Sequence, residues 1–335
     1  MRIHKGISTR PLLILVHGLG MTENSWVNPY HERTGMGRLP YDYILVDLGH
    51  APTFRWNKSP EGFTSSTPWR YLPHRPPSFW DTLARRGYNL LTWSQREQYG
   101  PVSSGVEQLQ QVWEEGRKMF GNKRVMLIGH SQGGLIIREC LRRDERIRRA
   151  VHGAIFLATP HHGSRLADVA EALGKLFISL EKFLPAGALD GPRRSYSQWT
   201  TSLRTRAVED LKPQSSLVRT LQHWEDHERK SGIRYVNLLG VSTCFNKIYR
   251  IVKTDPFEAR EIFSLLDSLP SLILSHVLPD EWINGRGDGL VAEDRGRLAW
   301  IPPHDQRAFP VNHASLLIDR RVRAMVLQRL EELSA

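Results

Sequence analysis

Ser131 is the residue whose setting most favours nucleophilic chemistry. It lies in G-H-S-Q-G-G at 129–134, which fits the pattern G-x-S-x-G with one further glycine behind it. The apolar run at 124–128 predicts a strand before it, and residues 135–142 predict a helix after it. A tight turn between a strand and a helix strains the serine backbone and presents its hydroxyl at a helix N-terminus, where negative charge is stabilised. We therefore predict that Ser131 is a nucleophile.

A serine hydroxyl is a poor nucleophile without a base and an acid that orients the base. His313 is our candidate base because it lies in a loop that opens the last predicted helix. Two other histidines compete for this role. His276 lies in an apolar stretch, which favours a packed side chain, and His304 follows two prolines, which favours a surface loop.

The orienting acid is expected between the serine and the histidine. Asp288 lies in G-R-G-D-G at 285–289, directly before an apolar run. Glycines on both sides permit a tight loop that points the carboxylate inward. The competing aspartates, Asp280, Asp294 and Asp305, lie in loops with fewer glycines. We therefore favour Asp288.

A tetrahedral intermediate also needs hydrogen-bond donors for its oxyanion. The stretch H-G-L-G at 17–20 follows the apolar run at 12–16, and its small residues let backbone N–H groups approach a bound carbonyl oxygen. We predict that the backbone amides of Leu19 and Gln132 form the oxyanion hole.

These residues need a scaffold that brings distant segments together, and the elements alternate along the chain. Apolar runs predict strands, and amphipathic patterns predict helices; Ser78 is the expected N-cap of the first helix and Gly87 its stop. The alternation predicts an α/β fold with a mostly parallel sheet and helices on both faces. The strands are expected at 12–16, 43–46, 89–93, 124–128, 151–158, 233–239 and 298–301, and the helices at 78–86, 102–120, 135–142 and 314–333.

Three tracts carry none of these motifs. Residues 31–77 include an irregular loop at 51–77, residues 165–231 begin with a helical apolar pattern over 166–183, and residues 243–285 include a predicted helix at 257–269. The remaining residues suffice for one α/β core. We therefore predict that residues 1–335 form a single domain. Residues 165–231 would be an inserted cap or lid over an acyl pocket, and 243–285 a second insertion.

Taken together, the motifs resemble those of α/β-hydrolases of the bacterial lipase and esterase type. The resemblance is carried by L-V-H-G-L-G at 15–20, G-H-S-Q-G-G at 129–134, A-T-P-H-H-G-S at 158–164, G-D-G-L-V at 287–291 and N-H at 312–313. The order serine, aspartate, histidine is that of the family. The resemblance implies an α/β-hydrolase fold with a lid, and a substrate site lined by His17, Gly18, His130, His161 and His162.

The same resemblance raises the question of a metal. Many bacterial lipases hold a structural calcium through an aspartate shortly after the catalytic histidine, whereas Ala314 and Ser315 stand there in this chain. His161 and His162 have no further residues at ligand spacing. We therefore predict no metal and no cofactor.

The charge of the chain is a separate matter. Its formal net charge is +11, and the densest basic stretch, 138–149, interleaves six arginines with three acids. That mixture indicates a solvated helix face, so we expect no nucleic-acid partner and leave contact with a lipid surface open. No apolar run is long enough to cross a bilayer. The first residues show no export signal, so we expect a cytoplasmic protein.

The predicted activity is hydrolysis of a carboxylic ester, from short acyl esters to lipids, through an acyl-enzyme. The same residues would serve a thioesterase, an amidase or an acyltransferase, because the leaving group alone differs. A binding protein that has lost catalysis is disfavoured, since all three reactive residue types are present. The oligomeric state stays open.

Overall fold

The computed structural model describes residues 1–29, 32, 77–121, 123–165, 205–242, 279–283 and 285–334. It also describes the backbone of six strands outside those ranges. These are β3 (Arg33–Thr34), β4 (Gly37–Arg38), β5 (Tyr43–Asp47), β6 (Arg55–Trp56), β11 (Lys247–Thr254) and β12 (Phe257–Ser264).

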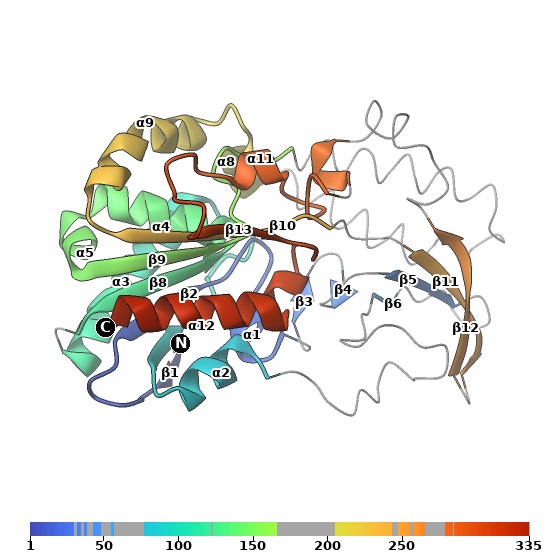
Figure 1. The fold of residues 1–335 in the computed structure, drawn as a ribbon, viewed down its shortest axis with the longest axis horizontal. Coiled ribbons are helices and arrows are strands. Elements are labelled where there is room, and N and C mark those ends of the chain that lie inside the picture. The colour runs from blue at the N-terminus through green and yellow to red at the C-terminus, as the bar shows by residue number, and fades with distance from the viewer. Residues whose placement is uncertain are drawn as a thin grey trace.

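A seven-stranded sheet forms the centre of the molecule (Figure 1). Its order is β1-β7-β2-β8-β9-β10-β13, and every neighbouring pair is parallel except β1 with β7. The mostly parallel sheet predicted from the alternating pattern is therefore confirmed. The strands are β1 (Arg2–His4), β2 (Leu12–Val16), β7 (Asn89–Thr92), β8 (Val125–His130), β9 (Val151–Leu157), β10 (Arg234–Gly240) and β13 (Gln306–Phe309).

The sheet is buried because helices cover both of its faces. In Figure 1, α2 and α12 lie on one side, and α4, α5 and α9 lie on the other. All residues of β2 and β8 are buried, as continuous apolar strands of a covered sheet require. The helices are α1 (Asn24–Val27), α2 (Phe79–Arg85), α3 (Val102–Phe120), α4 (Gln132–Arg143), α5 (Glu145–Ala150), α8 (Arg206–Leu211), α9 (Ser216–Lys230), α11 (Glu293–Gly296) and α12 (Arg320–Ser334), with 3-10 turns at Asp280–Trp282 and Ser315–Leu317.

The last strand and the last helix differ from the prediction. Residues 298–301 form a turn, although Leu298 and Ile301 are buried, and the last strand is β13. The edge strand β13 has exposed and half-buried residues, so its sequence lacks an apolar run. The last helix begins at residue 320 rather than 314, because the Asp319 carboxylate accepts hydrogen bonds from the N–H groups of Arg321 and Val322 and caps it there.

Residues 257–269 were expected to be helical, and this prediction is wrong where the structure describes them. Residues 257–264 form β12, which pairs antiparallel with β11 in a four-stranded sheet of order β12-β11-β5-β6. The start of this segment alternates apolar and charged residues, F-E-A-R, which favours a strand. The predicted strand at 43–46 exists as β5, but it belongs to this second sheet, which Figure 1 draws apart from the first.

The predicted cap at 165–231 is described only from residue 205 onward. There the chain forms α8 and α9, and α9 packs against α4. The guanidinium of Arg138 on α4 is fully buried and donates to both carboxylate oxygens of Glu228 on α9, with Nε 2.8 Å from Oε1. These helices therefore pack with the central sheet. The helix expected over 166–183 and His276 lie outside the described residues.

Candidate active site

Ser131 stands at the turn between β8 and α4. Its φ of 55° and ψ of −127° lie where residues other than glycine are rare, and such a conformation costs about 1–3 kcal/mol. Its backbone N–H donates to the carbonyl of Leu157 at 2.9 Å, and its carbonyl accepts from the N–H of Gly134 at 3.0 Å. The hydroxyl does not cap the helix that follows. The turn thus holds Ser131 in a strained backbone and leaves the side chain uncommitted.

Three glycines around Ser131 are required by close approach of the backbone. A Cβ on Gly129 would lie 2.7 Å from the nitrogen of Gly134. A Cβ on Gly133 would lie 2.7 Å from the carbonyl oxygen of His17, and one on Gly134 would lie 2.8 Å from Cβ of Thr159. The pattern G-x-S-x-G-G is therefore explained by packing of the turn against the loops after β2 and β9.

The structure brings Asp288 and His313 into direct contact. Nδ1 of His313 lies 2.8 Å from Oδ2 of Asp288, and the two side chains are 3% and 1% exposed. Because a carboxylate accepts, Nδ1 carries the proton and donates, which leaves Nε2 as the basic nitrogen. The other carboxylate oxygen accepts from the N–H groups of Leu290 at 3.0 Å and Val291 at 2.7 Å. The pair is thus desolvated and held in one orientation.

The backbone around Asp288 fixes this pair further. The carbonyl of Asp288 accepts from the N–H of His313 at 2.9 Å. Gly289 has a φ of 98°, which a side chain would disfavour, and a Cβ on Gly287 would lie 2.5 Å from Cα of Glu281. The glycine-dense stretch therefore permits the sharp loop that the sequence predicted.

His130 joins the histidine loop to the serine turn. Its Nε2–H donates to the carbonyl of His313 at 3.0 Å, and the two ring centroids are 4.8 Å apart. Among the described residues, no hydrogen bond links the Ser131 hydroxyl to the His313 ring. The nucleophile candidate and the base candidate are therefore brought together through His130, which directly precedes Ser131 in the chain.

The predicted oxyanion donors lie beside this turn. A Cβ on Gly18 would lie 2.8 Å from Cβ of Ser131, so the loop at 17–20 approaches the serine closely. In the described part of the chain, no hydrogen bond uses the backbone N–H of Leu19 or of Gln132. The side chain of Gln132 donates to the carbonyl of Gly100 at 3.1 Å, so its backbone amide and not its side chain remains free.

His17 holds that loop with both ring nitrogens. Its Nδ1–H donates to the carbonyl of Gly18 at 3.0 Å, and its Nε2 accepts from the backbone N–H of Gln95 at 3.0 Å. Burial lowers the pKa of the His17 imidazole to about 4, so the ring is neutral near pH 7. Its expected contact with substrate stays a prediction, and its observed contacts are with the backbone. Gln95 is a partner that motif reasoning missed.

The two histidines after β9 face different surroundings. His161 is fully buried, packs edge-on against Phe156, and has Nδ1 3.4 Å from Nη1 of Arg138. Burial and the neighbouring guanidinium lower the pKa of His161 well below its usual value. His162 is half-buried, and its Nδ1 accepts from Nε2 of Gln222 at 3.1 Å. Neither residue belongs to a group of three or more possible metal ligands among the residues that are described.

Two polar residues of the quoted motifs, Ser164 and Asn312, shape the site, although the sequence assigned neither of them a role. The hydroxyl of Ser164 donates to the carbonyl of Leu290 at 2.6 Å and ties the loop after β9 to the loop of Asp288. The carboxamide oxygen of Asn312 accepts from the N–H groups of Ala314 and Ser315 and shapes the turn at His313. An asparagine two residues before a turn amide is a recognisable signal; the serine contact, 126 residues apart, has none.

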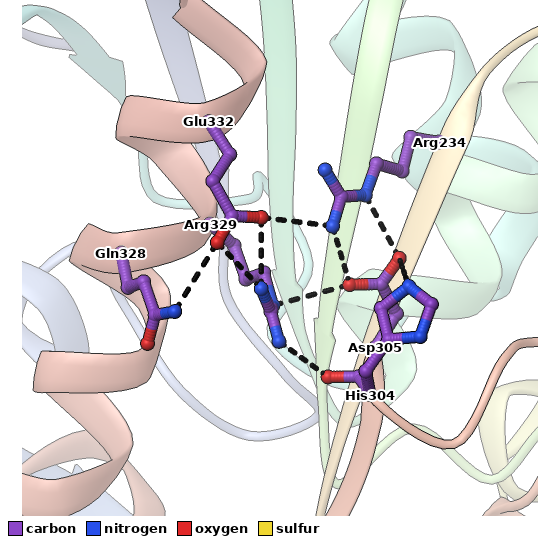
Figure 2. A network of polar contacts seen from close by, with 6 residues as sticks. All are labelled: Arg234, His304, Asp305, Gln328, Arg329 and Glu332. Atoms are coloured by element: carbon purple, nitrogen blue, oxygen red, sulfur yellow. Dashed lines mark hydrogen bonds and ion pairs between the residues drawn. The ribbon is translucent and has the colours of Figure 1, made fainter.

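The competing residues lie elsewhere. The side chain of His304 is 65% exposed, and Asp305 beside it binds the guanidinium of Arg234 (Figure 2). Both stand just before the first residue of β13, whereas Ser131 directly follows the last residue of β8, so the two sites lie at opposite ends of the parallel strands. Asp280 pairs with Arg286, and the Asp294 carboxylate accepts from the N–H of Arg295. These aspartates therefore have other partners.

The basic stretch at 138–149 is largely neutralised by ion pairs. Arg142 and Arg143 both bind the carboxylate of Glu139, and Arg149 binds Glu145. Arg146 lies within 3.2 Å of Asp144 and of Glu114. Alternating charges on neighbouring turns thus account for most of the stretch, but the expected solvated face is wrong at Arg138 and Glu139, which are buried. No described helix is long and apolar enough to span a membrane.

The chain belongs to the alpha/beta hydrolase family, whose sequence profile matches residues 13–324. This membership supports a hydrolase activity and confirms the resemblance seen in the motifs. A search of curated proteins by sequence finds no match.

Solved structures show the same fold at low sequence identity. A lipase from Bacillus licheniformis in its mature form has a TM-score of 0.54 at 16% identity, covering 98% of this chain and 96% of that one. The propeptide form of that lipase gives 0.53 at 16% identity, covering 100% of this chain and 52% of that one. A metagenomic carboxyl esterase gives 0.46 at 13% identity, covering 98% and 77%.

Proposed function

We propose that the chain hydrolyses carboxylic esters through an acyl-enzyme on Ser131. The observation that carries the proposal is the buried hydrogen bond between Asp288 and His313, whose loop is tied to the serine turn by His130. A buried carboxylate on Nδ1 raises the basicity of the opposite nitrogen, Nε2, and stabilises the imidazolium that forms when a proton is taken up. That is the arrangement a serine hydroxyl needs to become a nucleophile.

The reaction proceeds in two balanced halves. Nε2 of His313 takes the Ser131 proton as Oγ attacks the ester carbonyl carbon, and the oxyanion accepts hydrogen bonds from the amides of Leu19 and Gln132. The imidazolium then returns the proton to the leaving alcohol as the ester bond breaks. Water adds to the acyl-enzyme by the same route, which releases the carboxylic acid and restores Ser131.

An ester is favoured over a thioester or an amide by the proteins of the same fold. One structural neighbour, which covers 98% of this chain and 96% of its own, is described as a lipase. We extend that substrate class to this chain as part of the proposal. The acyl pocket would include the loop after β9, where His161 and His162 stand, and part of the cap expected at 165–231.

The test uses p-nitrophenyl acyl esters of increasing chain length, with a thioester and an anilide of the same acyl group beside them. We expect wild-type protein to hydrolyse the esters fastest, and Ser131→Ala to lose at least about 10⁴-fold in kcat. Ser94→Ala, at an exposed serine, is the matched control and should keep wild-type rates. Full activity in Ser131→Ala would overturn the proposal, and a preference for the thioester or the anilide would change the substrate class.

A further inference from the structure

His130 is a fully buried histidine that the proposed reaction does not use. It stands between Ser131, its neighbour in the chain, and His313, to whose carbonyl its Nε2–H donates at 3.0 Å. The two rings are tilted by 56° with centroids 4.8 Å apart. Its position in the interior argues against direct contact with a substrate.

The backbone of His313 is therefore held from two sides. Its N–H is bound by the carbonyl of Asp288, and its carbonyl is bound by His130. Nδ1 is held by the Asp288 carboxylate, which leaves Nε2 as the ring nitrogen without a hydrogen bond among the described residues. The hydrogen bond from His130 is the contact that relates this loop to the turn of Ser131.

The chemistry of the contact fixes the state of the His130 ring. A carbonyl oxygen only accepts, so Nε2 carries the proton. Burial, and then the nearby His313, lower the pKa of His130 well below its usual value, so the ring is neutral and Nδ1 is unprotonated. Nδ1 has no hydrogen-bond partner among the described residues, and a Cβ on Gly18 would lie 3.1 Å from it.

The same ring thus touches two loops of the site. One nitrogen binds the loop of His313, and the other packs against the loop at 17–20, which also approaches Cβ of Ser131. A change in the size or donor capacity of this ring would shift both loops relative to the serine. Misplacement of reacting groups by about 1 Å is enough to slow an enzyme on the order of 10²-fold.

We propose that His130 is a positioning residue, whose Nε2–H bond to the His313 carbonyl sets the reach of the His313 ring to the Ser131 hydroxyl. The inference rests on the proposed function. The residue that makes this bond directly precedes Ser131. The same motif would therefore supply the nucleophile and hold its base in position.

The variants His130→Phe and His130→Gln separate shape from hydrogen bonding. Phe keeps a planar ring of similar size without a donor, so kcat for the ester should fall about 10- to 100-fold while KM changes less than about twofold. Gln supplies an N–H near the position of Nε2 and should recover most of that loss. The rate at which a fluorophosphonate labels Ser131 should follow kcat in both variants.

Cys140→Ala is the burial-matched control, because Cys140 is fully buried on α4, nine residues after Ser131. It should lower the melting temperature and leave kcat unchanged. The inference is overturned if His130→Phe keeps wild-type kcat, or if Phe and Gln lose activity equally and in proportion to melting temperature. Ser131→Ala is assayed in parallel. Full activity in that variant would overturn the proposed function itself, whereas an inactive Ser131→Ala means that the His130 variants test only the positioning role.

A measurement on the wild-type protein does not depend on the variants folding. Nitrogen-15 shifts of the His130 ring should show a protonated Nε2 and an unprotonated Nδ1, unchanged from pH 8 to pH 5. An Nδ1–H tautomer, or titration of the ring in that range, would contradict the inference.

Discussion

The two ends of the strands in the seven-stranded sheet differ in what binds their buried carboxylates. We call the end at which the parallel strands finish the carboxyl edge and the end at which they begin the amino edge. At the carboxyl edge, the Asp288 carboxylate accepts hydrogen bonds from the imidazole of His313 and from two backbone amides. At the amino edge, Asp305 binds Arg234 through two hydrogen bonds of 2.8 Å and lies 3.1 Å from Arg329 (Figure 2). Both carboxylates are nearly fully buried.

The difference teaches what each carboxylate is suited to do. Asp305 is surrounded by guanidinium groups that are always charged, and Glu332 extends the network to the last helix. Its ion pairs with these groups join β10, β13 and α12. In the proposed reaction, the partner of Asp288 becomes a cation when His313 takes the serine proton, so Asp288 would stabilise a charge that exists only during catalysis.

The largest expected effect is on catalysis at the carboxyl edge. Asp288→Asn should lower kcat/KM for the ester about 10⁴-fold, because an amide that donates to Nδ1 would leave the His313 proton on Nε2. The measurement is ester hydrolysis with the melting temperature as a check on folding. His304→Gln, at an exposed histidine of the amino edge, should keep activity within about twofold. Equal losses of activity in Asp288→Asn and His304→Gln would show that the two edges do not differ in their importance for catalysis.

The next largest effect is on stability at the amino edge. Asp305→Asn should lower the free energy of unfolding by about 3 kcal/mol, because it removes the buried carboxylate that binds Arg234 and Arg329 and leaves them only the half-exposed Glu332. The change is read from urea denaturation at pH 7. The activity of the folded fraction should equal that of wild type. A fall in kcat without a fall in stability would show that the two edges are not separate in function.

The third effect concerns pH. Unfolded histidine has a pKa near 6.5, and His17 in the folded chain has a pKa of about 4, so the unfolded state binds more protons between those values. The free energy of unfolding should therefore fall as pH drops from about 7 to 4. His17 accounts for about 3 kcal/mol of that fall.

The variant His17→Gln isolates this contribution. Urea denaturation at pH 7, 5.5 and 4 should show a shallower fall in the variant than in wild type. Asp305→Asn serves as the comparison at the amino edge and should keep the wild-type slope over the upper half of that range. Parallel curves for wild type and His17→Gln would contradict the expected contribution of this imidazole.

The carboxyl edge was largely predictable because its signals are local. The pattern at 129–134 lies between a predicted strand and a predicted helix, and the glycines at 285–289 flank Asp288 directly before an apolar run. The contact between Asp288 and His313 spans 25 residues, yet both ends carry their own signal. What the sequence could not supply was the link through His130, because the carbonyl it binds belongs to a residue 183 positions away.

The amino edge was not predicted at all. The contacts of Arg234 with Asp305 and with Glu332 span 71 and 98 residues, and by sequence the three are ordinary charged residues of a predicted strand, a loop and a helix. The two mistaken elements have a related cause. In short segments such as 257–264 and 298–301, the spacing of apolar residues fits both a helix and a strand. Which of them forms depends on whether a neighbouring strand is there to pair with the segment.

The buried pair of Arg138 and Glu228 sets a limit on engineering a minimal version of this hydrolase. The tract from 165 to 231 looks removable by sequence, yet its last part supplies the carboxylate that neutralises a guanidinium with no exposure to solvent. Deleting residues 205–231 would leave that cation in the interior, at a cost of about 3–5 kcal/mol. That is comparable to the whole stability of many domains, about 5–15 kcal/mol. A shortened enzyme therefore has to keep α9, or replace Arg138 by an apolar residue in the same step.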